Sequence, residues 1–148
     1  WWRIGASLGL LSVFVQCLLG GRMATAWAGQ RCLAGGAACQ LVLSHRLTAM
    51  PVVVVVLGFA GAAVMAGGWA RQQWPWLVGA VLLMLVQVAL GVLTLRLGLS
   101  QPAVTVAHQL VAALLIALLA ALLIRSPNLP SPSRSVVLDD TSLEACHG

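Results

Sequence analysis

The chain has 148 residues, of which 61% are hydrophobic and only 7% are charged, and its mean hydropathy is +1.01. A soluble domain carries about 25% charged residues, so this composition excludes a water-soluble globular protein and predicts a membrane protein. The formal net charge of +5 comes from eight arginines spread singly along a chain without lysine or tyrosine. That pattern does not predict nucleic-acid binding.

Four apolar segments follow one another, each near the ~20 residues that cross a ~30 Å hydrocarbon core. They cover residues 4–23, 41–66, 76–97 and 103–124. Their short connections predict antiparallel helices, so residues 1–125 are expected to form an all-α, four-helix transmembrane bundle. A signal peptide is not the favoured interpretation of the first segment, because only Arg3 precedes it and its apolar stretch is too long.

The composition changes abruptly after Arg125. SPNLPSPSRS is rich in Pro and Ser, and VVLDDTSLEACHG contains all three acidic residues of the chain. Such a segment has too little apolar content to form a core, so residues 126–148 are predicted to be a disordered tail. The sequence begins at Trp1 rather than at a methionine, so a fragment, or one half of a longer protein, is among the interpretations.

Two of the apolar segments share a short motif. VQCLLG at residues 15–20 matches VQVALG at residues 86–91, and each is followed by a loop and a segment with a histidine near its start. A repeat of two helical hairpins, the first with a longer loop, predicts pseudo-two-fold symmetry. Gln16 and Gln87 need partners at membrane depth. Bonding across helices and reaching a functional site both stay open for them.

The loop of the first hairpin carries two cysteines. Cys32 and Cys39 flank a Gly-Gly pair that permits a tight reversal, so a disulfide is the favoured interpretation and a free, exchanging dithiol is the alternative. Cys17 lies mid-span and Cys146 lies in the tail. Arginines fall four on each side of the membrane and do not set the orientation. Because disulfides persist outside the cytosol, we expect the Cys32–Cys39 loop outside and both termini inside.

Two histidines occupy matching places in the repeat. His45 and His108 lie near the starts of the second and fourth helices, which run in the same direction, so both imidazoles are expected at similar depth. For the fourth helix, Ser100 is expected to cap and Pro102 to stand in the first turn. An ionisable residue inside a span indicates function by default. The pair is placed to ligate one haem iron, one histidine on each axial face.

The histidines have alternative roles. A histidine that only forms a hydrogen bond between helices is the alternative for either residue alone. The absence of carboxylates from all four spans argues against a proton relay and against oxygen-ligated Mg²⁺ or Ca²⁺. Two histidines without a third ligand or a base also make a poor zinc site. His147, in the tail, is expected to be inert.

Arginines near haem usually contact its propionates, which are bidentate anionic partners. Arg46 directly follows His45, and Arg22 and Arg96 end the first and third spans on the same side. For Arg46 a propionate contact is the favoured interpretation. For Arg22 and Arg96, extension of the side chain to the membrane interface is an equal alternative.

The order of these motifs resembles the haem A synthase (CtaA-type) family. The resemblance covers nearly all of residues 8–124, and VQCLLGG, VQVALG, CLAGGAAC, the SHR at residues 44–46 and the AHQ at residues 107–109 carry it. It implies two similar four-helix halves in the complete enzyme, each with a paired-histidine haem site. It also implies oxidation of the haem O methyl group to the formyl group of haem A, an electron donor, and a bacterial cell membrane.

One departure from the family pattern concerns catalysis. The family's catalytic half typically has a glutamate one turn before the histidine of its second helix, and Val42 occupies that position here. The chain therefore resembles the C-terminal half that binds haem b as cofactor, acting as a homodimer or with a second four-helix half. Its catalytic residues are unknown. A non-catalytic b-type cytochrome for electron transfer and a structural membrane subunit are the alternatives.

Overall fold

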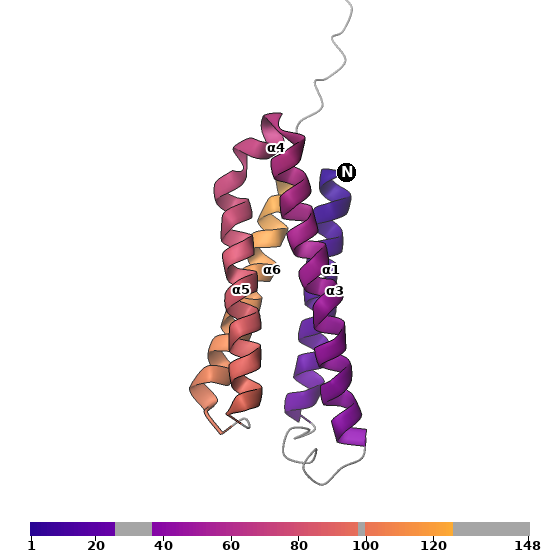
Figure 1. Ribbon diagram of the computed structural model, residues 1–148, viewed down its shortest axis with the longest axis vertical. Coiled ribbons are helices and arrows are strands. Elements are labelled where there is room, and N and C mark those ends of the chain that lie inside the picture. Colours follow the sequence, from indigo (N-terminus) through magenta and orange to yellow (C-terminus); the bar gives the residue numbers. More distant parts are fainter. Residues whose placement is uncertain (26–36, 98–99, 126–148) are drawn as a thin grey trace, which may run out of the picture.

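The computed structural model describes residues 1–25, 37–97 and 100–125. This part of the chain is built of helices and contains no strand. The long helices are α1 (Trp2–Thr25), α3 (Ala37–Ala66), α5 (Trp74–Arg96) and α6 (Pro102–Ile124), and a short helix, α4 (Gly68–Gln72), joins α3 to α5 (Figure 1). All four long helices have the length and hydropathy to cross a membrane. The predicted all-α membrane bundle is confirmed, whereas the predicted tail lies outside the described residues.

Prolines and glycines shape the helix ends. Gly67 and Gly68 have φ of 67° and 52°, a left-handed conformation that glycine adopts readily, and there the chain turns from α3 into α4. Pro102 begins α6 as predicted. The prediction that Ser100 caps α6 was wrong, because Gln101 is the N-cap and makes no side-chain cap bond. The Ser100 hydroxyl instead donates to the Leu97 carbonyl at 2.6 Å, which satisfies an acceptor at the end of α5.

The bundle consists of two hairpins, α1 with α3 and α5 with α6. The hairpins meet mainly through α1 and α6 and less through α3 and α5, whereas α3 and α6 make no backbone contact among the described residues. The helices that carry the two histidines are therefore diagonal partners across the bundle. The Trp2 indole Nε1–H donates to the Leu122 carbonyl at 2.8 Å, so the start of α1 and the end of α6 lie at the same end.

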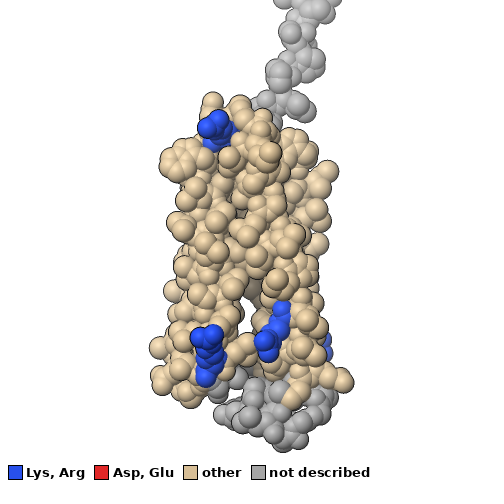
Figure 2. Space-filling model, viewed as in Figure 1, with Lys and Arg blue, Asp and Glu red and all other residues tan. Residues whose placement is uncertain are grey.

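The buried core occupies one half of the bundle. Apart from Ala70 in α4, every buried side chain of the described residues lies in one of four stretches, and we call these the packed half: residues 2–13, 56–63, 77–84 and 112–122. The opposite ends of the same helices contain no buried residue wherever burial is described, and we call them the open half: residues 14–23, 39–55, 85–97 and 100–111. Figure 2 shows an opening in the molecular surface within this lower half of the view.

An aromatic cluster closes the packed half. Trp2 is only 3% exposed, and its ring lies edge-on to Phe59 and Trp69 with centroid distances of 5.1 and 4.9 Å. Such pairs contribute about 0.5–1.5 kcal/mol beyond the area they bury. Arg125 stacks over Trp76 with its guanidinium carbon 4.1 Å from the ring centroid, a cation–π contact at the end of α6. The Trp2 contacts join α1 to α3 and α4, and the Arg125 contact joins the end of α6 to α5.

Gly5 is required where α1 approaches the aromatic cluster. A Cβ at this position would lie 2.5 Å from Phe59 Cδ2. Gly5→Ala is therefore expected to lower the free energy of unfolding by about 1–3 kcal/mol, the usual cost of overpacking, measured by thermal unfolding in detergent. Gly58→Ala is the matched control, because a Cβ there meets nothing within 4 Å. Equal stability of the two variants would contradict this packing.

Candidate functional site

The two histidines lie at equal depth in the open half. The apolar spans of their helices are Cys39–Ala66 and Pro102–Ile124, so His45 and His108 each stand six residues from the start of a span. At 1.5 Å per residue this is about 9 Å along each helix. The predicted pairing in depth and direction is therefore present, on the diagonal helices α3 and α6.

Each histidine is held by the glutamine of its own hairpin. The amide nitrogen Nε2 of Gln16 on α1 lies 3.2 Å from Nδ1 of His45 and donates to the His45 carbonyl at 2.7 Å. In the second hairpin, Nε2 of Gln87 on α5 lies 3.3 Å from Nε2 of His108. Both alternatives for the glutamines apply. Their side chains bond across helices, and the partners are the candidate site histidines.

Each imidazole also lies against a glycine. A Cβ on Gly20 would be 3.3 Å from Cε1 of His45, and a Cβ on Gly91 would be 3.2 Å from Cε1 of His108. Gly20 and Gly91 follow Gln16 and Gln87 by four residues, so glutamine and glycine share one helix face. Each hairpin thus repeats one arrangement, in which a glutamine holds a histidine that lies on a glycine.

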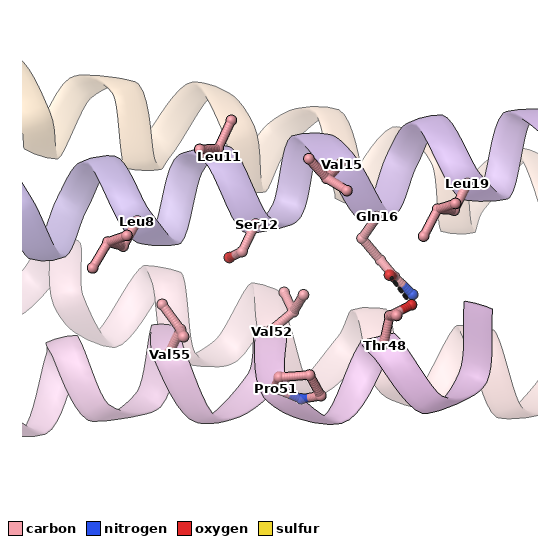
Figure 3. Close-up of a pocket in the computed structure, with 10 residues that line it drawn as sticks. All are labelled: Leu8, Leu11, Ser12, Val15, Gln16, Leu19, Thr48, Pro51, Val52 and Val55. Atoms are coloured by element: carbon pink, nitrogen blue, oxygen red, sulfur yellow. Dashed lines mark hydrogen bonds between the residues drawn. The ribbon is translucent and has the colours of Figure 1, made fainter. Parts of the chain in front are cut away.

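The two arrangements differ in a third polar residue. The Thr48 hydroxyl lies 2.9 Å from Oε1 of Gln16 and 2.8 Å from the Ser44 carbonyl (Figure 3). Thr48 follows His45 by three residues, and the matching position after His108 is Val111. As a result Gln87 has no equivalent donor. Its Oε1 and the Nδ1 of His108 are buried without a hydrogen-bond partner.

Basic side chains surround the mouth of the open half. Arg46 is exposed on α3 beside His45, and Arg22 and Arg96 lie in the last turns of α1 and α5. Figure 2 shows arginines on both sides of the surface opening at this end. These arginines place positive charge at the histidine end of the bundle, where it can attract an anionic group of a molecule bound there.

The predicted disulfide is only partly visible. Cys39 begins the apolar span of α3 and is disulfide-bonded, with a partner outside the described residues. Cys32 itself lies outside them, so the Cys32–Cys39 pairing stays a prediction. Cys17 is a free, half-buried thiol packed against the core.

Two surface grooves among the described residues have linings that do not include the histidines. One of about 370 Å³ runs between α1 and α3, and another of about 400 Å³ lies between α1 and α6. Figure 3 shows the first, where Leu8, Leu11 and Val55 give an apolar wall and Gln16 and Thr48 form a polar end. This polar end is the outer side of the hydrogen-bond network that holds His45.

The residues of the site suit a porphyrin better than a bare metal ion. Among the described residues, no group of three or more His, Cys, Asp or Glu could hold an ion. A porphyrin brings four equatorial nitrogens of its own, so two imidazoles complete the ligation of its iron. The open half and the neighbouring arginines fit such a group. Nε2 of His108 faces the Gln87 amide at 3.3 Å, so to ligate iron this nitrogen would turn away from Gln87.

Comparison with known proteins finds no protein-family model, no curated protein and no solved structure that matches this chain. The resemblance to haem A synthase therefore stays a prediction that stands on the motifs themselves.

Sequence reasoning missed three contributors to the site. Gly20 and Gly91 each follow the repeated glutamine by four residues in VQCLLG and VQVALG, so this repeated spacing was a usable signal. Thr48 gave no such signal, because its counterpart in the second hairpin is a valine. Only the contact between α1 and α3 reveals what Thr48 does.

Proposed function

We propose that this protein binds one haem b in the open half of its bundle, with His45 and His108 as axial ligands. The observation that carries the proposal is the repeated Gln–His–Gly arrangement on the two hairpins. It places two imidazoles at equal depth on diagonal helices, in the half of the bundle that has no buried side chain. When bound, haem supplies one-electron redox chemistry.

The chain's own residues hold and screen that group. The glycines allow each imidazole to lie close to the neighbouring helix, and the glutamines restrict its rotation. Arg46 on α3 and Arg96 in the last turn of α5 supply the positive charge that propionates need at the membrane surface.

The finer proposal is a haem A synthase role. The motif resemblance supports a chain that supplies the cofactor haem b, while a second four-helix half or a homodimer completes the conversion of haem O to haem A. Val42 lies on α3 three residues before His45, where the catalytic half of that family has a glutamate. We further propose a bacterial cell membrane, with the Cys32–Cys39 loop outside and both termini cytoplasmic.

A b-type cytochrome that only transfers electrons is the second candidate. The observation that favours it is the distribution of acidic residues, since all three lie after residue 138. No carboxylate is therefore available in the bundle as a general acid or base. A structural subunit would use the same Gln–His hydrogen bonds without haem.

The absorption spectrum of the purified protein tests the haem proposal. We expect a low-spin, bis-histidine b-type spectrum with one haem per bundle when the protein is produced in haem-replete cells. His147→Ala, in the tail, is expected to leave the spectrum unchanged. A correctly inserted, folded protein that remains colourless after haem addition would contradict the proposal and favour the structural subunit.

Product analysis separates the enzyme from the cytochrome. The protein is co-produced with a haem O source, alone and with a catalytic four-helix half, and the extracted haems are separated by chromatography. Haem A or its hydroxylated intermediate is expected only where the catalytic half is present. Bound haem b with no haem O conversion in either case would leave the electron-transfer cytochrome as the function.

A further inference from the structure

The Gln16 side chain is held in one orientation from both ends of its amide. Its Nε2 donates to the His45 carbonyl at 2.7 Å, and its Oε1 accepts from the Thr48 hydroxyl at 2.9 Å. A backbone carbonyl only accepts hydrogen bonds, so the amide atom that faces it must be the nitrogen. Reversal of the amide would place two carbonyl oxygens against each other. Both contacts therefore favour the same orientation.

This orientation decides which hydrogen bond Gln16 offers to the ring of His45. The same Gln16 nitrogen lies 3.2 Å from Nδ1 of His45. An amide nitrogen carries two hydrogens, one for the carbonyl and one for the ring, so Nδ1 is the acceptor. In a neutral imidazole the other ring nitrogen then carries the hydrogen, because the bond made by one nitrogen sets the state of the other. His45 is therefore held with its hydrogen on Nε2.

Iron ligation needs the opposite arrangement. A neutral histidine that binds iron through Nε2 carries its hydrogen on Nδ1 and almost always donates it to an acceptor. At His45 this Nδ1–H would face the N–H group of Gln16, so two donors would oppose each other. His45 can bind iron only when the ring or the amide turns and a hydrogen bond is given up.

The second hairpin lacks the fixed amide. Nε2 of Gln87 lies 3.3 Å from Nε2 of His108, and Oε1 of Gln87 is buried without a hydrogen-bond partner in the described part of the chain. Val111 stands where Thr48 stands in the first hairpin. No bond to its oxygen holds the Gln87 amide in one orientation, so the contact with His108 can be released by turning one side chain.

We propose that Gln16, fixed by Thr48, opposes iron ligation by His45 and thereby keeps haem binding reversible. This inference rests on the proposed haem function and deepens it, because the site then binds haem less tightly than its two histidines allow. Gln16 acts through His45 and not on the iron, so it is a positioning residue. The site is one from which haem can leave.

The test measures haem affinity by titration of the purified protein and haem release to an excess of apomyoglobin. Gln16→Leu removes the opposing N–H, so we expect haem to bind about 10-fold more tightly and to leave more slowly, at the lower end of the effects of outer partners on metal affinity. Thr48→Val frees one end of the amide and should act in the same direction by a smaller factor. It decides the test if Gln16→Leu does not fold. Gln109→Leu, the same change at an exposed position beside His108, is the matched control and should alter neither quantity.

A second measurement does not involve haem. Nitrogen NMR of the haem-free protein with labelled histidine, at a pH where imidazole is neutral, reports which ring nitrogen carries the hydrogen. The His45 signal is identified by its loss in His45→Ala, and we expect its hydrogen on Nε2.

Two results would overturn the opposing role of Gln16 and leave the haem proposal intact. One is a hydrogen on Nδ1 of His45. The other is haem binding that is unchanged or weaker in both Gln16→Leu and Thr48→Val. Failure of the unaltered protein and of both variants to bind haem would instead defeat the proposed function itself.

Discussion

Replacement of His108 or His45 by alanine is expected to abolish the low-spin haem spectrum. Each substitution removes one of two axial ligands, and among the described residues no other His or Cys joins a ligand cluster that could replace it. The His108 variant should lose haem on purification. The His45 variant should also lose most of its haem, because a single imidazole holds the iron more weakly than two do.

The histidine variants need a measure that separates ligation from folding. His108→Ala removes the side-chain partner of Gln87, at a cost of about 1–3 kcal/mol, whereas Gln16 keeps its bonds to the residue 45 carbonyl and to Thr48 in His45→Ala. Helicity and monodispersity in detergent are therefore recorded beside the spectra. Added imidazole is expected to restore the low-spin spectrum in the space left by the missing side chain. Alanine variants that remain folded and keep an unaltered spectrum would exclude these residues as ligands.

Enlargement of the glycines beneath the imidazoles is expected to weaken haem binding without touching a ligand. A Cβ on Gly91 or Gly20 would lie 3.2 or 3.3 Å from Cε1 of the adjacent histidine. Valine adds two further methyl groups there, and the ring must move away from the neighbouring helix. We expect moving the ring to weaken haem binding as much as losing a hydrogen-bond partner of a metal ligand does. Gly91→Val and Gly20→Val should therefore lower haem affinity by about 10–100-fold.

Gly21→Val provides a matched control for the glycine variants. Gly21 directly follows Gly20, yet a Cβ there meets nothing within 4 Å. Valine at both positions changes helix propensity equally, so only the contact with His45 differs. Haem titration of the two purified proteins gives the comparison. Equal affinities would show that the ring does not depend on the glycine.

The membrane architecture could be predicted because it depends on local composition. Length and hydropathy located all four spans, and α6 begins at Pro102 as expected. The repeat also predicted that His45 and His108 match in depth, since both count six residues from the start of a span. These features need no knowledge of which helices touch.

What escaped prediction depends on contacts between helices. Ser100 was expected as an N-cap, but its hydroxyl bonds the end of α5, a choice between two nearby partners that sequence alone does not fix. The short helix α4 follows from left-handed glycines that no hydrophobic periodicity marks. The link from Thr48 to Gln16 spans two helices, and its absence at Val111 explains why two similar hairpins hold their histidines differently.

The concentration of the core in one half has a consequence for assembly. Trp2, its bond to Leu122 and the edge-on rings of Phe59 and Trp69 fasten the helices at the end remote from the histidines. That end can therefore form when the hairpins insert into lipid, before any prosthetic group arrives. The histidine ends of the two hairpins lie in the open half, where no buried side chain of the described residues joins them. On the proposed haem function, haem would bind between two hairpins that are already joined at their other end.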